Sequence, residues 1–566
     1  MNYVLFGAGR CAEKIIDKMN ALGLSIEYIV DSNLAKHGTF FKNLPVRSPS
    51  VLNDWKCMDI MVIVAVVDST NQVEIIKQLN NLGMELNKNF FKGIEMFRLN
   101  EAPHGWVSGF INLPQNFDSI KSFDNQSRLI LLKEERRIFR VVDRKYVCEY
   151  ESIYKSLEKH GLLGKYVVDT RIIDNQWDIP YGLVLEHKYI ELISYSFEWP
   201  PVMFKEYVLF MIDFIEKLNC AGLTIKDGHA LNAVFYNGNF LFLDFGALTQ
   251  GNITYNTIVN FINTHINPLL LMSKNQISKA YLFLRNSGLE YTLIDIIGHL
   301  SSKEVTDYEE MFNKCVEFTA NGEMNGLCGW LNKYCENISL DFSVSRWIGY
   351  QDEEWEKLND IKKWTPKQKS VLELASSINP KTLIDLAGNM GLYAVALRSR
   401  LDYAIVMDLD FVCVDDLYNK IKISDGEINN IYPIYMNLVT PTLAYYKDDA
   451  IANSAIIPWR QNAFKRFRCD LALAISVVHH LAFSQQLTFA EIIAQFKLFT
   501  NRYLIVEFIQ QEDEYIKDFL KEDFEWYTKD FFVDELKKEF VVLKSMPSFP
   551  VKTRTLFLCE LKSDKL

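Results

Sequence analysis

The amino-acid sequence predicts a multidomain α/β protein, and three observations lead to this prediction. Residues 2–31 and residues 382–410 each read as a strand, a turn of small residues, a helix, a second strand and an acid. This succession is typical of a parallel sheet that binds a ligand at the carboxyl ends of its strands. Between the two stretches lie short apolar strands and one long amphipathic helix, which predict an α+β unit.

Length and composition narrow the class of protein. Because 566 residues exceed what one hydrophobic core supports, we expect three units at 1–98, 120–340 and 341–566. Hydrophobic residues make up 49% of the chain, and the net charge of -11 argues against a nucleic-acid partner. The most apolar run, 60–67, is far shorter than the roughly 20 residues of a membrane span, and the chain starts directly in a strand. The ten cysteines form no CxxC pair. We therefore expect a cytoplasmic protein with no integral membrane segment, zinc site or disulfide framework; its oligomeric state stays open.

The N-terminal unit carries a glycine turn in a strand–turn–helix context. Strand 2–6 leads into Gly7, Ala8 and Gly9, and strand 26–30 ends at Asp31; strand 59–67 and helix 71–82 follow. The turn has the form G-x-G-x-x-A with an acid about twenty residues on, which predicts a Rossmann-like domain. Gly7, Gly9 and Asp31 could bind a nucleotide, or the glycines could serve only the packing of helix on strand.

The stretch 30–49 of this unit resembles the small Rossmann-like domains of bacterial sugar-modifying enzymes. In those enzymes such domains often act as accessory modules. No Tyr-x-x-x-Lys or other reductase machinery accompanies the turn, so a glycine fingerprint by itself does not indicate an oxidoreductase.

The middle unit combines paired strands with a long helix and an acidic loop. The expected strands are 128–132, 137–142, 166–173, 181–186, 233–236 and 240–243, and the expected helices are 146–160 and 204–220. Residues 102–124 read as a connector. The loop places Asp227 five residues before Asn232, and Asp244-Phe245-Gly246 follows the last hairpin. A carboxylate, an amide and a second carboxylate in this order are the groups that phosphoryl transfer with Mg²⁺ requires.

The stretches 223–235 and 240–246 resemble the catalytic core of protein kinases. The resemblance implies that Asp227 approaches an acceptor hydroxyl, and that Asn232 and Asp244 hold Mg²⁺ at the phosphates of ATP. The glycine-rich phosphate loop is missing, and Arg140 stands at the position of the strand-three lysine, with Glu149 or Glu151 as its helix partner. An active phosphotransferase and a nucleotide-binding or scaffolding pseudokinase both stay open, because Arg is not equivalent to Lys.

The C-terminal unit has the clearest motif in the chain. An apolar run ends at Asp385, the turn reads D-x-A-G-x-x-G with Gly388 and Gly391, and a second strand ends at Asp408. Small residues let the backbone approach a ligand, and an acid at a strand end can bind ribose hydroxyls. Ala387 and Asn389 stand where a run of alternating glycines would place two more glycines.

This motif resembles motif I of class I S-adenosylmethionine-dependent methyltransferases, in the nodulation-protein-like branch found with bacterial surface-glycan genes. Residues 479–481 and 505–508 carry further matches, and the resemblance covers roughly the last third of the chain. It implies a second Rossmann-like sheet that ends in an antiparallel pair, 540–546 and 554–560. The residues that the resemblance implies for S-adenosylmethionine are Asp385, Ala387, Gly388, Gly391, Asp408, Asn437 and Asp470.

A histidine pair is the candidate for proton removal from a hydroxyl acceptor. His479 and His480 follow the fourth strand of this unit, and imidazole titrates near neutral pH. Glu507, at the end of the next strand, could orient a histidine or a substrate hydroxyl. The alternatives are a packed or hydrogen-bonded histidine pair and a solvent-facing acid. Tyr350 could contact substrate or cofactor, and Trp459 with Arg460 could stack on a ligand or clamp an anion.

Three functions are compatible with these motifs. The first is methyl transfer from S-adenosylmethionine to an oxygen of a glycan or other small surface-polymer precursor, and its acceptor class depends on the resemblance. The second is a bifunctional enzyme that phosphorylates and methylates the same acceptor with ATP and Mg²⁺. The third is a non-catalytic scaffold that binds nucleotides.

Overall fold

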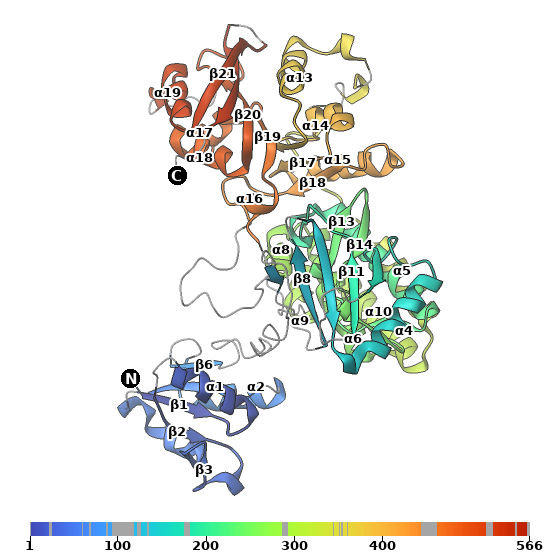
Figure 1. Ribbon diagram of the computed structural model, residues 1–566, viewed down its shortest axis with the longest axis vertical. Coiled ribbons are helices and arrows are strands. Elements are labelled where there is room, and N and C mark those ends of the chain that lie inside the picture. The colour runs from blue at the N-terminus through green and yellow to red at the C-terminus, as the bar shows by residue number, and fades with distance from the viewer. Residues whose placement is uncertain are drawn as a thin grey trace.

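The computed structural model describes most of the chain. The described residues are 2–21, 25–58, 60–66, 69–85, 89–92, 118–120, 126–132, 135–174, 182–285, 292–342, 345–349, 351, 355–358, 360–442, 461–516, 524–549 and 552–562. Three units follow one another along the long axis of the molecule, from the N-terminal to the C-terminal part of the chain (Figure 1). Within the described ranges, no helix combines the length and the apolar character that a membrane span requires.

The N-terminal unit is a six-stranded sheet in the order β3-β4-β2-β1-β5-β6, in which β3 and β4 alone pair antiparallel. Its elements are β1 Asn2–Phe6, α1 Arg10–Ala21, β2 Ile26–Val30, β3 Phe40–Phe41, β4 Leu44–Arg47, β5 Ile60–Val64, α2 Ser69–Asn81 and β6 Phe90–Lys92. Leu5 joins the apolar cluster of α1, whereas Val4 and Phe6 join that of α2. Both faces of the sheet are therefore buried, as a parallel sheet requires. The Rossmann-like assignment stays a prediction.

The middle unit begins with an antiparallel sheet in the order β10-β11-β9-β8-β7. Its strands are β7 Asp118–Ile120, β8 Ser127–Leu132, β9 Arg137–Val142, β10 Thr170–Ile173 and β11 Leu183–His187, and α4 is Val147–Lys159. Strand β7 lies where the sequence predicts a connector, because pairing with β8 defines it rather than an apolar pattern of its own. The predicted strand 166–173 is shorter than expected, since the Val168 N–H donates to the Phe242 carbonyl as part of a loop.

The rest of the middle unit is largely helical. Its helices are α5 Pro201–Cys220, α6 Tyr255–Phe261, α7 Asn267–Ser273, α8 Ile277–Arg285, α9 Leu293–Ile296, α10 Ser302–Asn321 and α11 Met324–Glu336. Two small antiparallel pairs join β12 Leu223–Ile225 to β15 Leu248–Gln250 and β13 Ala233–Tyr236 to β14 Asn239–Phe242. Helix α5 packs against α11 and β12. The three residues of β12 are buried, so the loop 226–232 begins at the end of a buried strand.

The C-terminal unit is a seven-stranded sheet in the order β18-β17-β16-β19-β20-β22-β21. The strands are β16 Thr382–Leu386, β17 Tyr403–Asp408, β18 Ile431–Tyr435, β19 Cys469–Ala474, β20 Thr500–Ile509, β21 Phe540–Pro547 and β22 Arg554–Leu561. The helices are α13 Pro366–Ile378, α14 Leu392–Leu397, α15 Phe411–Ile423, α16 Ala463–Arg466, α17 Val478–Phe483, α18 Phe489–Phe499 and α19 Lys529–Glu539. The first five strands in this order run parallel, and β22 is antiparallel to both of its neighbours. The α/β fold and the predicted antiparallel end are confirmed.

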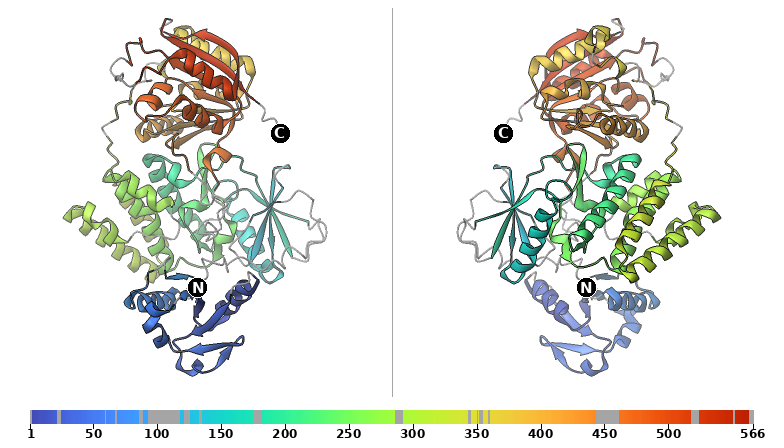
Figure 2. Two further views of the ribbon diagram at one scale, coloured as in Figure 1. Left: turned by 90° about the vertical axis from the view of Figure 1, so that its left-hand side faces the viewer. Right: turned by 90° about the vertical axis from the view of Figure 1, so that its right-hand side faces the viewer.

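The middle and C-terminal units share one apolar core. Buried side chains from Val142 to Cys559 form a single contiguous cluster, whereas the N-terminal unit has its own clusters. Across the boundary, the Asp415 carboxylate of α15 accepts a hydrogen bond from the Val202 N–H at the start of α5, at 2.8 Å. Arg466 also forms a buried ion pair with Glu198. The two units lie against each other in both views of Figure 2.

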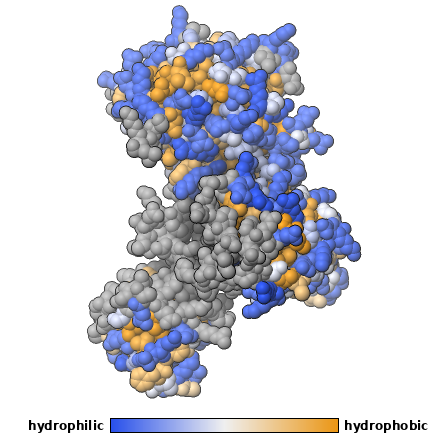
Figure 3. Space-filling view, viewed as in Figure 1, coloured by the Kyte–Doolittle hydropathy of each residue, from blue (hydrophilic) through white to orange (hydrophobic). Residues whose placement is uncertain are grey.

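The molecular surface is mixed in character. Figure 3 shows hydrophilic residues over most of the visible part of the C-terminal and middle units, with apolar areas between them. In the N-terminal unit, Leu34 is 80% exposed and Phe40 is 73% exposed. Scattered apolar side chains of this kind are common on soluble proteins and assign no function.

Candidate functional site

Two acids lie at the same edge of the C-terminal sheet. Asp385 is the penultimate residue of β16, and Asp408 is the last residue of β17, the neighbouring parallel strand. The carboxyl ends of parallel strands meet at one edge, where open α/β sheets bind ligands. The structure therefore brings together the two acids that the sequence singles out.

The turn after β16 is tightly packed against these strands. Ala387, Asn389 and Gly391 all have positive φ, at 57°, 53° and 72°. A Cβ atom on Gly388 would lie 2.8 Å from Cγ of Asp385, and one on Gly391 would lie 2.6 Å from a methyl group of Val406. Real Cβ atoms do not approach so closely, so both glycines are required by packing.

The two carboxyl groups are electrostatically coupled. Asp385 is 2% exposed, and its Oδ2 has no hydrogen-bond partner among the described residues. Burial, and secondly the negative charge of Asp408, raise the pKa of Asp385 to about 8. Burial also raises the pKa of Asp408 to about 6, although its oxygens accept hydrogen bonds from the N–H groups of Asp410 and Asn389, both at 2.8 Å. A buried acceptor of this kind suits a ligand that brings a positive charge or hydrogen-bond donors.

Asn437 and Asp470 differ in where they lie. Asn437 follows β18 at the same sheet edge as Asp408, and its side-chain oxygen accepts a hydrogen bond from the Val439 N–H at 2.8 Å. Its amide nitrogen is thus the group that it can offer to a ligand. Asp470 is a correction: it lies beside Thr382 at the amino end of the sheet, where it accepts hydrogen bonds from the N–H groups of Lys381 and Thr382. The reason is that Asp470 is the second residue of β19 rather than the last.

The histidine pair begins helix α17, directly after β19. His479 is 6% exposed, and its ring centroid lies 4.0 Å from that of His480. Burial, followed by the charges of His480, Arg554 and Lys367, lowers the pKa of His479 to about 3. Burial and then Arg346 lower the pKa of His480, which is half-buried. Both imidazoles are therefore neutral at pH 7, the state in which a ring nitrogen can accept a proton.

Glu507 is not a solvent-facing acid, and its carboxylate is bound by side chains of the protein itself. It is fully buried in β20, and its carboxylate accepts hydrogen bonds from Lys367 at 2.7 Å, from Ser476 at 2.9 Å and from Ser548 at 2.6 Å. Burial works to raise its pKa, but the charge and hydrogen bond of Lys367 outweigh that effect, so the pKa is lowered. The expected interaction with a histidine or a substrate hydroxyl is therefore corrected, because these three side chains occupy its oxygens.

A strap of residues 345–349 crosses the glycine turn, and the sequence motifs did not indicate its contacts. Ser345 hydrogen-bonds to Asp410, and the Trp347 carbonyl accepts a hydrogen bond from the Asn389 side chain at 3.3 Å. The Trp347 ring meets the His480 ring edge-on, with centroids 5.3 Å apart. The sequence signal for this segment is Tyr350, which was expected to contact substrate or cofactor, and helix α13 lies between the strap and β16. Tyr350, Trp459 and Arg460 lie outside the described residues.

A buried polar network lies in the middle unit around Arg140. This side chain is 2% exposed and donates to Asp244 at 2.8 Å, to Ser127 at 2.8 Å and to His187 at 3.4 Å. The hydroxyl group of Tyr150, on α4, also reaches Ser127, at 3.3 Å. The expected helix partner is thus corrected: Glu151 pairs with Lys155 one turn along α4, and Glu149 lies in the first turn of that helix. Tyr150 is the α4 residue that hydrogen-bonds to this network, and Ile153 and Leu157 are buried on the same helix.

The residues of the acidic loop lie next to this network. The Asn232 side chain donates to the Asp227 main-chain carbonyl at 3.0 Å, and the main-chain carbonyl of Asn232 accepts the N–H of Leu243, which precedes Asp244. Asp227 is more than half exposed, with His229 at 3.7 Å. Asn232 therefore lies next to the residue before Asp244, and magnesium binding by this pair stays a prediction. Across the described residues, His, Cys, Asp and Glu side chains form no group of three that could hold a metal ion.

The glycine turn of the N-terminal unit is in contact with Lys36, whose ammonium group donates to the Ala8 carbonyl and to Asp31. Gly7 has φ 110°, and a Cβ atom there would lie 2.7 Å from Val66, whereas Gly9 has open space around it. Asp31 accepts hydrogen bonds from the Ala8 N–H at 2.7 Å and from Lys36 at 2.9 Å. Burial works to raise its pKa, but these hydrogen bonds outweigh it, and the pKa is lowered. Gly7 thus has a packing role, and nucleotide binding at this turn stays a prediction.

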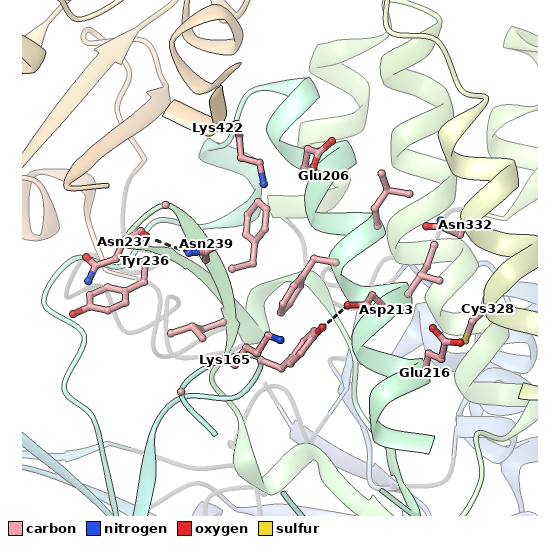
Figure 4. A pocket seen from close by; sticks show the side chains of 18 of the residues that line it. Lys165, Glu206, Asp213, Glu216, Tyr236, Asn237, Asn239, Cys328, Asn332 and Lys422 are labelled. Atoms are coloured by element: carbon pink, nitrogen blue, oxygen red, sulfur yellow. Dashed lines mark hydrogen bonds between the residues drawn. The ribbon is translucent and has the colours of Figure 1, made fainter. Parts of the chain in front are cut away.

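A groove of about 970 Å³ lies apart from these residues, at the boundary of the middle and C-terminal units (Figure 4). Helix α5, the β13–β14 hairpin and α11 form its walls, and Lys422 of α15 reaches into it from the C-terminal unit. None of the sequence-predicted site residues lines this groove. It is therefore separate from both candidate sites.

Comparison with known proteins gives distant similarities. No family model matches the chain. Nodulation protein NoeA of Rhizobium meliloti (strain 1021) is 24% identical over 461 residues, which cover 75% of this chain and 92% of that protein. The solved structure of N-methyltransferase NodS from Bradyrhizobium japonicum WM9 is 10% identical, covers 38% of this chain and 99% of its own, and has a TM-score of 0.26. The bifunctional kinase-methyltransferase WbdD is 11% identical, covers 38% and 42%, and also has a TM-score of 0.26. The residues of the site therefore carry the functional assignment.

Proposed function

We propose that the C-terminal unit binds S-adenosylmethionine and transfers its methyl group to a small acceptor. The observation that carries this proposal is the cradle at the carboxyl ends of β16 and β17. There, packing requires Gly388 and Gly391, and the buried Oδ2 of Asp385 has no partner among the described residues. These features fit a nucleoside-like ligand with a positive charge, because a buried carboxyl oxygen without a partner among the described residues and a second acid lie at one edge of the sheet.

Cofactor binding and removal of the acceptor proton are assigned to different residues in this proposal. In this proposal Asp408 accepts ribose hydroxyl groups, Asn437 donates to an adenine base, and Asp385 stabilises positive charge near the turn; the position of the first two at one sheet edge supports it. S-adenosylmethionine supplies a methyl group on a sulfonium with a built-in leaving group, so the protein mainly positions the acceptor and excludes water. His480, half-buried and neutral, is the candidate base for a hydroxyl proton.

We further propose an oxygen acceptor in a glycan or surface-polymer precursor. A neutral histidine beside an aromatic side chain, Trp347, supports a hydroxyl acceptor, since a hydroxyl group needs a base when it is methylated. The glycan class itself follows from the motif resemblance to the nodulation-protein-like branch.

Calorimetric titration of the full chain with S-adenosylhomocysteine tests the cofactor site. We expect binding by the native protein and a loss of at least tenfold in affinity in Asp408→Ala. Asp402→Ala, at the exposed amino end of the same strand, is the matched control and keeps the native affinity. Absence of binding by the native protein at millimolar ligand would reject the methyltransferase proposal.

A second candidate function is nucleotide binding by the middle unit. The ion pair of Arg140 with Asp244 and the position of Asn232 beside Asp244 favour it, because they assemble a cation, an amide and a carboxylate at one place. The proposal extends to phosphoryl transfer to the same acceptor if Asp227 serves as base. The remaining alternative is a non-catalytic scaffold.

Titration with ATP, with and without Mg²⁺, separates these alternatives. Binding that needs both Mg²⁺ and Asp244, and is lost in Asp244→Asn, supports the bifunctional enzyme. Binding that Asp244→Asn leaves unchanged supports a pseudokinase, and absence of ATP binding leaves a scaffold for this unit. Asp169→Asn, an exposed acid before β10, is the control substitution.

A further inference from the structure

The turn that joins β19 to α17 is held by an ion pair from two other elements. Ser476 has φ 56°, a left-handed conformation that L-residues rarely adopt. The Glu507 carboxylate, on β20, accepts hydrogen bonds from both the N–H of Ser476, at 3.1 Å, and its hydroxyl group, at 2.9 Å. The Lys367 ammonium, in the first turn of α13, donates to the same hydroxyl group at 2.6 Å and to Glu507 at 2.7 Å.

This arrangement holds Ser476 by its backbone and its side chain at the same time. The Ser476 hydroxyl group accepts from Lys367 and donates to Glu507, so all three groups are satisfied within one triangle. Ser548 closes the other side of the carboxylate, at 2.6 Å. Glu507 is fully buried and Lys367 is 15% exposed, so water cannot easily replace either partner.

The direction of α17 follows from this turn. The Val477 carbonyl accepts the N–H of Leu481 at 3.1 Å, so Val477 caps the helix and Ser476 comes directly before that cap. His479 and His480 lie in its first turn. A change in the φ of Ser476 would therefore swing both imidazoles relative to β19.

The charged groups around the histidine pair come from several elements. Arg346 of the strap, Lys367 of α13 and Arg554 of β22 act as positive charges, and Asp513, after β20, acts as the opposing negative charge. Arg554 is paired with Asp513 at 2.8 Å, and Lys367 is paired with Glu507. The Lys367–Glu507 pair is the one that also contacts the backbone of the turn.

We propose that Glu507 and Lys367 are positioning residues that hold the Ser476 turn in its left-handed form and thereby direct the histidine pair. This inference rests on the proposed methyl-transfer site, since it assigns a task to residues that support the candidate base. It replaces the expectation that Glu507 contacts a histidine or the substrate. The alternative to a positioning role is that the Lys367–Glu507 ion pair only stabilises the sheet as a whole.

Local hydrogen exchange and histidine NMR test the proposal on the full chain. In Glu507→Gln we expect amide exchange in 476–483 to rise at least tenfold, with no comparable change in β16 or β17. The ring signals of ¹³C-labelled His479 and His480 should shift in the same variant. Lys367→Met should alter the same signals, and Lys367→Met with Glu507→Gln should leave the turn loose although no net charge is buried.

Controls separate a local role from a general one. The control is the ion pair of Lys497 with Glu539 in the same unit, whose nitrogen and oxygen atoms are 2.7 Å apart. Substitutions that remove this pair should leave the amide exchange of 476–483 and the histidine signals unchanged. Ser476→Ala removes only the hydroxyl group, and it is the milder variant if Glu507→Gln fails to fold; we expect a threefold or larger rise in exchange. Unchanged exchange and histidine signals, or a uniform rise across the sheet, would overturn the proposal.

Titration with S-adenosylhomocysteine distinguishes a failure of the inference about the turn from a failure of the proposed methyltransferase function. We expect Glu507→Gln to bind it with native affinity, because the cradle is built on β16 and β17. Failure of the native protein to bind would reject the methyltransferase proposal, whereas the exchange experiment would still report on the turn.

Discussion

Asp385 shows how one residue can combine packing and charge in a ligand site. Its side chain packs against Gly388, and its Oδ2 faces no partner among the described residues. Burial and the neighbouring Asp408 carboxylate together raise its pKa to about 8. In the protein without ligand this carboxyl group therefore stays protonated at neutral pH, which avoids two adjacent buried negative charges.

The raised pKa predicts a pH-dependent stability that Asp385→Asn should remove. Between its ordinary value of 3.8 and about 8, the folded protein binds a proton that the unfolded chain has lost, so the free energy of unfolding falls as the pH rises. Asparagine does not titrate, so we expect the variant to gain stability relative to native protein by up to about 1.4 kcal/mol per pH unit. Urea unfolding at pH 5, 6, 7 and 8 measures the difference. Parallel curves for the two proteins would contradict the prediction, and Asp402→Asn should give parallel curves.

Gly388 allows a direct test of the cradle geometry. Gly388→Ala would place a Cβ atom 2.8 Å from Cγ of Asp385, and we expect a loss of about 1–3 kcal/mol in the free energy of unfolding, together with weaker binding of S-adenosylhomocysteine. Gly9→Ala is the matched control, since a Cβ atom at that position meets nothing within 4 Å. Thermal unfolding and calorimetric titration of both variants decide the point; equal stability of the two would show that the turn can relax.

For single residues, sequence patterns predicted the positions of acids and glycines better than the hydrogen-bond partners of side chains. Asp385, Asp408, Gly388 and Gly391 converge as expected, because strand ends and turn residues are local features. Glu507 was misassigned because its partners come from α13 and from residue 548, far away in sequence. No local pattern encodes such contacts.

Helix α5 begins with a cap that comes from a different unit. Its own N-cap residue is Pro200, which offers no side-chain hydrogen bond, and the Asp415 carboxylate of α15 accepts the Val202 N–H instead. Burial raises the pKa of Asp415 well above its ordinary value. A protonated carboxyl group can still accept a hydrogen bond through its carbonyl oxygen, so the cap does not depend on charge.

The cap predicts different effects of two substitutions at position 415. Asp415→Ala removes the acceptor and leaves the first N–H groups of a buried helix end unsatisfied, so we expect a loss of about 1–2 kcal/mol in stability. Asp415→Asn keeps a neutral oxygen acceptor and should stay within about 0.5 kcal/mol of the native protein. Urea unfolding at pH 7 measures both. A loss of equal size in Asp415→Asn would show that the charge matters rather than the acceptor.

The elements themselves were largely predictable from sequence. Strands such as β1 and β2 match the predicted bounds because an apolar run and a glycine turn delimit them. Strand β7 was missed because it has three residues, two of them polar, and depends on pairing with β8. Asp470 was assigned to the cofactor by the motif resemblance, although its place as the second residue of its strand puts it at the amino end of the sheet.

On the scale of the whole molecule, the middle and C-terminal units behave as one body. They share a contiguous apolar core, the Asp415 cap and the buried ion pair of Arg466 with Glu198. The Arg466 guanidinium also lies 4.1 Å from the centroid of the Tyr195 ring. The N-terminal unit has separate apolar clusters on each face of its sheet.

Scanning calorimetry should therefore resolve two unfolding transitions rather than three. We expect one transition for the N-terminal unit and one cooperative transition for the other two units together, because shared cores unfold together. S-adenosylhomocysteine should raise the Tm of the larger transition alone, and Leu5→Ala should lower the other one alone. Separate transitions for the middle and C-terminal units would contradict the prediction.

The helix cap across the boundary has a consequence for the history of the chain. A gene fragment that encodes only the middle unit would produce a long helix with an uncapped end and a bare apolar face, which invites aggregation and proteolysis. Recombination that replaced the last third with an unrelated sequence would also leave the helix end uncapped, unless the new sequence placed a hydrogen-bond acceptor beside the Val202 N–H. We therefore expect these two parts to be inherited as a pair, while the N-terminal unit can be gained or lost independently.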